Sequence, residues 1–536
     1  MIKISDISIP LDYSENYIKK IIAKKLRINI KNIESIKINK KSVDARKKDD
    51  VHFVCSFNVK LKNLDETKLI KKFKYVTTTE PYIYNLPKHS KLNYRPVIVG
   101  FGPAGMFAAL ILAQAGQFPI VLERGKDVDS RTKDVDLFWE SGVLNENSNV
   151  QFGEGGAGTF SDGKLNTGIK NKRINKVFSE FVKAGAPEEI LYLSKPHIGT
   201  DKLKEVVKNI RKNIINLGGE IRFNSRLNGI KLKNNQVCTV KVNSDYSNEY
   251  EIETDNVILA IGHSARDTFE YLNNLGVKME AKAFSVGVRI EHSRKLIDKS
   301  RYGKFYNHPS LSAADYKLST HLKSGRGVYT FCMCPGGTVV GAASEKGCLV
   351  TNGMSEFARD KQNSNSAVLV GITPKDFNGE SVLAGVEYQR RIERKAFELG
   401  GGDYTAPIQL LGDFLKQISS SNLGDVLPSY KPGFKLTDIS SCFPSYVSES
   451  IRYAIAEMDK QLNGFSCYDA IITAAETRSS SPLRILRDEK FESVNIKGLY
   501  PCGEGAGYAG GIVSAAVDGI KCAESILKKT FKESGE

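Results

Sequence analysis

The chain has 536 residues, of which 41% are apolar and 26% are charged, as expected of a globular protein with two to four domains. Nine scattered cysteines, an odd number, and the lack of an apolar signal segment argue against a secreted disulfide framework and favour the cytoplasm. No run of about 18 apolar residues occurs, so we expect no transmembrane helix and no membrane partner.

The net charge is +16, from 77 basic and 61 acidic residues. Such an excess of positive charge is typical of proteins that bind nucleic acid or an anionic substrate, but solvated lysines in a Lys-rich chain produce it as well. The lysines are spread out and form no long basic run, which favours the second explanation. Nucleic acid stays open as a partner without being favoured, and the small-molecule substrate and the oligomeric state are undefined.

Residues 1–90 are predicted to form a small, ferredoxin-like α/β domain. Its expected elements are a strand, a helix and two further strands: Ile2–Ile9, Ser14–Leu26, Ile33–Ile38 and His52–Lys62. A basic turn, Lys40–Lys48, joins the last two strands, and the polar stretch Pro87–Tyr94 leads into the next domain.

Residues 91–282 begin with the strand–helix–strand order that opens a doubly wound parallel sheet, so we expect a Rossmann-type α/β domain. These first elements are Pro96–Val99, Gly102–Ala115 and Pro119–Glu123. The remaining ones are a helix, a strand, a β-meander and an apolar, buried strand: Asp201–Leu217, Glu220–Phe223, Leu227–Thr254 and Asn256–Ile261.

Residues 283–473 mix short strands with helices, which indicates an inserted α+β substrate or cap domain. The expected strands are Phe284–Ile290, Val328–Met333, Thr338–Ala342 and Ala367–Gly371, and the expected helices are Ser381–Leu399 and Val447–Leu462. Residues 474–536 return to the first domain with a glycine-rich turn and a helix.

Gly100, Gly102 and Gly105 form the pattern G-x-G-x-x-G between the first strand and helix of the Rossmann-type domain. In that context Gly100 permits the tight turn, Gly102 lets the backbone approach a pyrophosphate, and Gly105 lets helix and strand pack closely. Pro103 and Ala104 lie in the first turn of the helix Gly102–Ala115, whose free N–H groups face the phosphates. The pattern therefore predicts a dinucleotide site.

Glu123 and Arg124 follow the second strand of this unit. A carboxylate at that position can accept hydrogen bonds from the adenosine ribose and would repel a 2′-phosphate. The adjacent arginine weakens that exclusion. NADP is therefore disfavoured, but this motif alone does not separate FAD from NAD.

Two later segments favour FAD. Val257–His263 is an apolar strand that ends at Ala260 and Gly262, and Gly498–Gly511 is a glycine-rich turn before a helix that begins at Ile512. Together they resemble the FAD-binding signature of glutathione-reductase-like flavoproteins, with Ile261 and Glu504 in place of the usual Thr and Asp. The resemblance implies that Gly503 and Glu504 contact the ribityl chain, and that Gly510 and Gly511 place a helix N-terminus near the flavin ring.

A third glycine-rich run, Phe152–Asn166, is interspersed with Phe and Leu and is therefore unlike a linker. We expect its backbone to lie against the same ligand, although a flexible surface loop is the alternative. The residues predicted to contribute are Gly155, Gly156, Gly158, Thr159, Ser161, Asp162 and Gly163.

Motifs along almost the whole chain resemble one family, the uncharacterised bacterial FAD-dependent dehydrogenases with an N-terminal α/β domain. They include S-V-D-A-R-K-K (42–48), G-F-G-P-A-G-M (100–106), G-E-G-G-A-G-T-F-S-D-G-K-L (153–165), K-P-H-I-G-T-D (195–201), C-M-C-P-G-G (332–337), N-G-M-S (352–355), E-T-R-S-S-S-P-L-R-I (476–485) and G-E-G-A-G-Y-A-G-G-I (503–512). The resemblance implies the cofactor but no particular substrate.

We identify no second dinucleotide motif of the kind that binds NAD(P)H, and a C-x-x-C or C-x₄-C motif is absent, which separates the chain from the two-dinucleotide disulfide reductases. NADH or NADPH remains open as a transient electron donor. No spacing typical of metal ligands occurs, so we expect no metal.

Four residues are candidates for catalysis: His197, Cys332, Cys334 and Arg478. On a regular strand the two cysteines would project from one face and could form a redox couple, or they could be small buried apolar side chains. His197 could act as a general acid or substrate anchor. Arg478 could clamp an anionic substrate or pair with an internal glutamate.

The sequence therefore favours an FAD-dependent oxidoreductase that transfers hydride or electrons between FAD and an unidentified substrate. An RNA-modifying flavoprotein that grips phosphates through Arg46, Lys47 and Lys48 is an alternative. A non-catalytic FAD-binding regulator is another.

Overall fold

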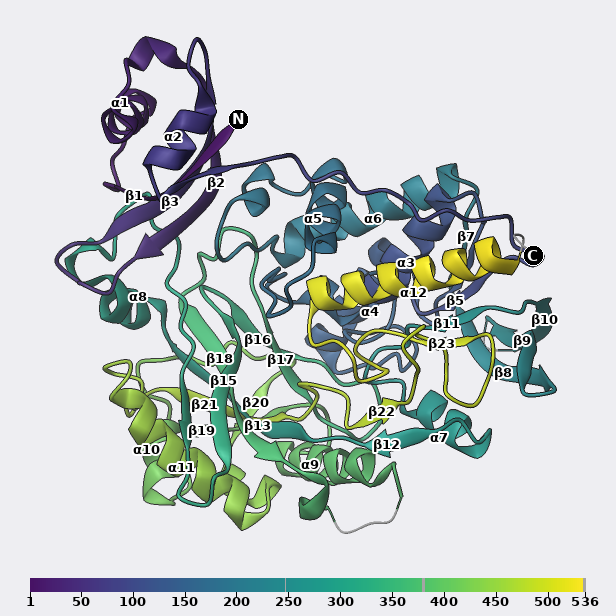
Figure 1. The fold of residues 1–536 in the computed structure, drawn as a ribbon. Coiled ribbons are helices and arrows are strands. Elements are labelled where there is room, and N and C mark those ends of the chain that lie inside the picture. Colours follow the sequence, from purple (N-terminus) through teal and green to yellow (C-terminus); the bar gives the residue numbers. More distant parts are fainter. Residues whose placement is uncertain (246, 378–380, 534–536) are drawn as a thin grey trace.

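A computed structural model describes residues 1–245, 247–377 and 381–533. Three main sheets organise the molecule: a small one near the N-terminus, a parallel one, here called the central sheet, at the right in Figure 1, and a large, mostly antiparallel one at the lower left. No helix among the described residues combines the length and the hydropathy that crossing a bilayer requires.

The N-terminal unit packs two helices against an antiparallel sheet of order β2-β3-β1-β4. Its elements are β1 (Ile2–Ile9), α1 (Glu15–Leu26), β2 (Ile33–Asp44), β3 (His52–Leu61), α2 (Glu66–Lys72) and β4 (Val76–Thr78). Ile18 and Ile22 of α1 are buried with the isoleucines of β1. The turn expected at Lys40–Lys48 is wrong in its first half, because antiparallel pairing with β3 continues β2 through Asp44.

The segment 79–96 runs from the N-terminal unit across the outside of the central part of the molecule (Figure 1). The Tyr84 hydroxyl donates to Glu524 at 3.0 Å, and the Leu92 N–H donates to Gln117 at 2.9 Å. These bonds fix the segment against the helices of the central part.

The central sheet has five short parallel strands in the order β23-β11-β5-β6-β7. They are β5 (Val97–Val99), β6 (Ile120–Leu122), β7 (Glu220–Arg222), β11 (Val257–Leu259) and β23 (Leu499–Pro501). Alternate residues face opposite sides, so Ile98 packs in one cluster while Val97 and Val99 pack in another. The predicted α/β Rossmann-type core is confirmed.

Helices cover one face of this sheet and a β-meander covers the other. The helical side holds α3 (Pro103–Gln114), α5 (Arg173–Lys183), α6 (Thr200–Asn216) and α12 (Ile512–Glu533). The meander side holds β8 (Ser225–Lys233), β9 (Gln236–Ser244), β10 (Asn248–Glu253) and α7 (Arg266–Asn274). Apolar residues surround α3 on all sides, as a helix buried between a sheet and α12 requires.

The large sheet has the order β14-β15-β18-β13-β21-β19-β20. Its strands are β13 (Phe284–Ser293), β14 (Ser319–His321), β15 (Gly327–Cys334), β18 (Asn363–Ile372), β19 (Ala406–Leu410), β20 (Phe434–Leu436) and β21 (Ile471–Glu476). Two two-stranded sheets lie beside it: β16 (Thr338–Gly341) with β17 (Thr351–Met354), and β12 (Met279–Ala281) with β22 (Leu483–Ile485).

The remaining helices are α4 (Val128–Ser141), α8 (Arg294–Tyr302), α9 (Ala384–Gly400), α10 (Leu411–Lys416) and α11 (Ser445–Asp459). The predicted division at 473/474 falls inside β21, which pairs with β13 in the large sheet. The boundaries between the four predicted domains stay predictions.

β15 is not the regular strand that the sequence predicted. Its pairing with β18 shifts register between Phe331 and Cys334, and Cys332 adopts the left-handed conformation with φ of 43°. This bulge inserts one extra residue, so the strict alternation expected for Cys332 and Cys334 does not hold.

Candidate functional site

A cleft opens where the parallel strands end and the large sheet begins. Its lining includes the turn after β5, the ends of β6 and β11, residues 151–164, parts of β15 and β17, the end of β21, and residues 502–515. The fold therefore brings the three glycine-rich segments, far apart in the sequence, to one cleft. Most predicted cofactor residues line it: Gly100, Gly102, Pro103, Ala104, Glu123, Arg124, Gly156, Gly158, Ser161, Asp162, Ala260, Gly262, Glu504, Gly510, Gly511 and Ile512.

Five predicted residues do not line the cleft: Gly105, Gly155, Thr159, Gly163 and Gly503. They shape the turns behind it. A Cβ at Gly105 would lie 1.9 Å from the Gly100 carbonyl oxygen, which is why helix α3 packs so closely on the turn. The Gly503 N–H donates to Asp518 at 2.8 Å, and the Thr159 hydroxyl donates to the Glu154 carbonyl at 3.2 Å.

The first and third glycine segments face each other across the cleft. Gly100 has φ of 98°, and a Cβ there would lie 2.3 Å from the Ala260 carbonyl oxygen, so the turn requires glycine. A Cβ at Gly102 would lie 3.6 Å from the Cα of Gly156. Backbone therefore lines both sides at the N-terminus of α3, a geometry that admits phosphate groups.

Glu123 is buried and ties the turns together. Its carboxylate accepts hydrogen bonds from the N–H groups of Phe101 (2.8 Å), Gly125 (2.9 Å) and Gly153 (3.0 Å). The side chain thus fixes the first and third glycine segments to the end of β6, in addition to lining the cleft. Its contact with a ribose stays a prediction.

Arg124 and Asp162 are held by other side chains. Arg124 donates to Asp267 at 2.8 Å and lies over the ring of Phe152. Asp162 is fully buried, and its carboxylate pairs with Lys164 and Arg359, each at 2.5 Å. Asp162 therefore anchors the loop that carries Lys164 into the cleft.

The late glycine segment supplies a second helix N-terminus. A Cβ at Gly510 or Gly511 would meet nothing within 4 Å, so the backbone before α12 is open to the cleft. Burial raises the pKa of the nearby Glu504 to about 7, although Lys282 opposes the shift. An open helix N-terminus beside a cleft is a favourable place for negative charge.

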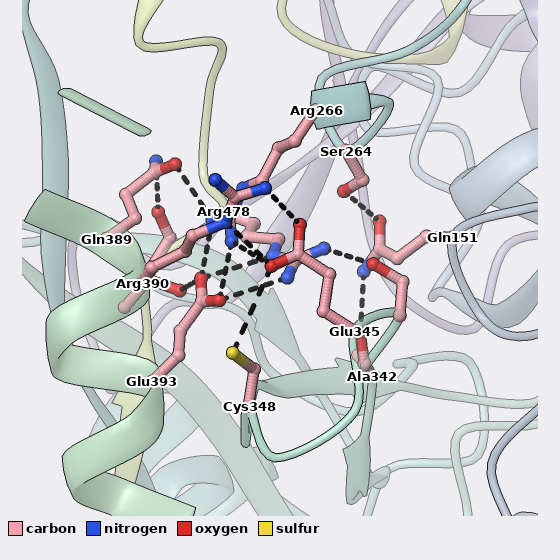
Figure 2. Close-up of polar contacts among 12 residues, drawn as sticks. Gln151, Ser264, Arg266, Ala342, Glu345, Cys348, Gln389, Arg390, Glu393 and Arg478 are labelled. Carbon is pink, nitrogen blue, oxygen red and sulfur yellow. Dashed lines mark hydrogen bonds and ion pairs between the residues drawn. The ribbon is translucent and has the colours of Figure 1, made fainter. Parts of the chain in front are cut away.

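Arg478 belongs to a buried charge network and is no free anion clamp (Figure 2). Its guanidinium donates to Glu393 of α9 at 3.0 and 3.2 Å and also to Ser344. Arg266 of α7 donates to the same carboxylate at two distances of 2.8 Å. Although burial opposes ionisation, the two arginines hold the pKa of Glu393 well below its usual range.

Glu345 extends this network, because it pairs with Arg266 and Arg390 (Figure 2). Beside the network, Gln151 joins the Ser264 hydroxyl to the Ala342 carbonyl (Figure 2). Sequence reasoning missed Arg266 and Glu393. In the sequence, both are simply charged residues within amphipathic helices, and such residues usually face solvent.

His197 lies outside the cleft lining. It is buried, stacked on Phe357 with ring centroids 5.3 Å apart, and its Nε2 lies 3.1 Å from the Phe357 carbonyl oxygen. Burial and the charge of Arg359 lower its pKa to about 4. It is therefore neutral near pH 7. His263 does line the cleft, and burial with nearby Arg478 lowers its pKa to about 3.

The large-sheet end of the cleft carries ionisable side chains. Lys164, Cys332, Glu476 and Glu504 all line it, whereas Cys334 lies fully buried behind Cys332. Glu476 pairs with the buried Arg289 at 2.8 Å, yet burial still raises the pKa of Glu476 to about 7.

Two family models match the chain. Residues 283–479 match "FAD-dependent protein, C-terminal domain-like", and residues 1–60 match "Domain of unknown function (DUF8436)". A Clostridium beijerinckii protein, described as uncharacterised, is 51% identical over 533 residues, or 98% of this chain and 99% of the relative. The chain belongs to the same family, one of FAD-dependent proteins. The cofactor of this flavoprotein is FAD, as its motifs predicted.

Two solved flavoprotein structures resemble this chain distantly. A halogenase PltM mutant in complex with FAD has a TM-score of 0.40 at 10% identity, over 82% of this chain and 71% of that chain. A Bacillus halodurans glycerol-3-phosphate dehydrogenase complexed with FAD has a TM-score of 0.36 at 12% identity, over 82% and 65%. Such scores assign neither fold nor activity, so the cofactor rests on the family and the site.

Proposed function

We propose that this flavoprotein is an oxidoreductase that transfers hydride or electrons between FAD and a substrate held at the large-sheet end of the cleft. One observation carries the proposal: a single cleft has glycine backbone at one end and, at the other, ionisable side chains that include Cys332 of β15 and Glu476 of β21. Bound FAD supplies a ring that accepts and returns two electrons. We include in this proposal that the reaction is a dehydrogenation.

The residues present fit FAD in one orientation. The N-terminus of α3, at Gly102 and Ala104, would hold the pyrophosphate, and Glu123 would meet the adenosine ribose. Glu504 would bind the ribityl hydroxyls, and the open turn at Gly511 would place the N-terminus of α12 beside the ring. That arrangement leaves Lys164 and Glu476 near the substrate.

The protein's own groups can orient a substrate and hold its protons. Lys164 is a cation held in the cleft wall by Asp162 and by the Met333 carbonyl. Glu476 and Glu504, each with a pKa raised to about 7 by burial, can exchange a proton near neutral pH. The large-sheet end of the cleft is therefore suited to a polar or anionic substrate that loses or gains a proton together with two electrons.

The visible spectrum of the purified protein, before and after anaerobic addition of NADH or NADPH, tests the proposal. We expect flavin bands, and their bleaching would identify a nicotinamide as the electron donor. Protein that takes up no flavin on reconstitution would refute the proposal. Bound FAD that no nicotinamide, dithiol or dithionite reduces would instead favour a non-catalytic regulator.

Three finer assignments accompany this proposal. The order of elements and the sheet order β2-β3-β1-β4 support a ferredoxin-like class for the N-terminal unit. The Rossmann-type core with its late glycine turn supports a glutathione-reductase-like subtype. All nine cysteines are free in the structure, as suits a cytoplasmic protein.

A second candidate function is action on RNA. Residues 1–80 hold 19 Lys and Arg residues against ten Asp and Glu residues, so much of the net positive charge lies in this unit. Phosphate binding there would weaken steeply with salt. Full-length protein that binds no RNA at low salt would exclude this candidate.

A further inference from the structure

The two cysteines at the end of β15 lie where the strand leaves regular geometry. Cys332 has φ of 43°, an uncommon conformation for a residue other than glycine, and the ladder with β18 skips from Phe331 to Cys334. Such strain persists only where surrounding contacts enforce it, and it is concentrated at functional sites. Here it lies at Cys332, two residues before Cys334.

The Cys334 side chain lies against the backbone of Cys332. The Cys334 thiol donates to the Cys332 carbonyl oxygen at 3.2 Å. On a regular strand, residues two apart are separated by about 6.6 Å between Cα atoms, near the upper limit for a disulfide. The bulge therefore favours the approach that an S–S bond needs.

Positive charge surrounds this pair. The guanidinium of the buried Arg289 donates to the Cys332 carbonyl oxygen at 2.5 Å and lies 3.7 Å from the Cys334 sulfur. Lys164 bonds to the carbonyl of the intervening Met333. The hydrogen bond from Cys334 and then the two cations hold the pKa of Cys332 below its usual value, while burial raises that of Cys334. These surroundings favour the thiolate of Cys332 and the thiol of Cys334.

Only the first cysteine is open to the cleft. Cys332 lines it together with Glu476 and Glu504, and Cys334 is fully buried behind it. Glu504 comes from the late glycine segment, which would surround the flavin end of FAD. An exposed thiolate backed by a buried thiol is the arrangement of an attacking and a resolving cysteine.

We propose that Cys332 and Cys334 are a dithiol–disulfide pair that exchanges two electrons with FAD in the cleft, and that the substrate of this site is a thiol or disulfide. The proposal rests on the proposed function. In the oxidising direction, the Cys332 thiolate, the Cys334 thiol and FAD become the disulfide and FADH⁻. One S–S bond forms and one S–H bond breaks, and the electron pair and the thiol proton pass to FAD.

The same step in reverse reduces the pair. FADH⁻ returns two electrons and one proton, which leaves the Cys332 thiolate and the Cys334 thiol. A substrate disulfide is then reduced by attack of the Cys332 thiolate, followed by attack of Cys334 on the mixed disulfide. No further oxidant or reductant enters either step.

The first experiment needs no FAD reduction and uses the wild-type full chain. Protein with and without FAD is oxidised with diamide, then denatured, alkylated and digested. We expect a disulfide between Cys332 and Cys334 in one peptide, and two alkylated thiols after treatment with dithiothreitol. Two free thiols under both conditions would overturn the proposal, even if FAD binds normally.

The second experiment tests the link to FAD in the oxidised holoprotein. Anaerobic dithiothreitol should bleach the flavin in the wild type, and at least roughly tenfold more slowly in C332S and C334S, because the small dithiol first attacks the protein disulfide. C238S, at a cysteine in β9 outside the cleft, is the matched control. Equal bleaching in all four proteins would overturn the coupling. Protein that binds no FAD would overturn the proposed function and with it the exchange with FAD, but not the disulfide detected in the first experiment.

Discussion

At one end of the cleft, glycine backbone faces the ligand, whereas at the other end charged and sulfur-containing side chains do so. The glycine end is made by turns whose conformations only glycine adopts easily, such as Gly100 with φ of 98°. The large-sheet end depends on buried ion pairs, such as Arg289 with Glu476 and Arg478 with Glu393. One end is therefore defined locally and the other by contacts between distant segments.

The difference matters for how each end responds to substitution. A change in a glycine turn should act first on FAD, because the backbone itself is the binding surface. A change in the charge network should act first on stability, because removal of one partner leaves another charge buried without compensation. The following predictions test that division.

Glu393→Gln should have the largest effect. The substitution leaves Arg266 and Arg478 buried without their shared carboxylate, so the free energy of unfolding should fall by about 3–5 kcal/mol. Denaturant unfolding measures the loss. Glu387→Gln, on the exposed side of the same helix, is the control and should change stability little. Equal stability of both variants would contradict the network's structural role.

Gly102→Val should come next. The added side chain fills the space between the α3 N-terminus and Gly156, so the affinity for FAD should fall roughly a hundredfold, about 3 kcal/mol. Fluorescence titration of apoprotein with FAD measures the change. Gly168→Val is the matched control, since nothing lies within 4 Å of a Cβ there. Unchanged affinity in Gly102→Val would mean that FAD avoids this turn.

Protonation of His197 should make the stability of the protein depend on pH, with an effect smaller than those of the two substitutions above. Its pKa is lowered from 6.5 to about 4 in the folded state, so the unfolded chain binds the extra proton between those values. Its contribution to stability is full above pH 6.5 and is lost as the pH falls, by about 2 kcal/mol at pH 5.

His197→Gln should flatten this loss of stability between pH 7 and pH 5. His321→Gln, at an exposed histidine of β14, is the control and should follow the wild type. Urea denaturation at several pH values provides the comparison. A variant as sensitive to acid as the wild type would place the titrating group elsewhere.

Glu504→Gln should have the smallest effect. If the carboxylate accepts hydrogen bonds from the ribityl chain, FAD should bind more tightly as the pH rises through the raised pKa of about 7. The wild-type affinity should then change by less than about tenfold from pH 6 to pH 8, and the variant should show no such dependence. A pH dependence that survives in the variant would exclude Glu504 as its source.

Local rules were sufficient for the glycine end. The order of strand, turn and helix around Gly100–Gly105 specifies the α3 N-terminus, because the hydrophobic pattern and the glycine positions lie within a few residues of one another. The β-meander and the buried strand β11 were readable for the same reason. The glycine-rich segments also indicated FAD without any information on tertiary contacts.

The large-sheet end was decided only by tertiary structure. The partner of Arg478 is Glu393, 85 residues earlier in the chain, and no local pattern distinguishes that glutamate from a solvated one. The bulge at Cys332 likewise follows from pairing with β18, so strand periodicity misplaced its side chain. Sequence determines turns and amphipathic faces because they depend on neighbouring residues, whereas burial of charge depends on which distant segments meet.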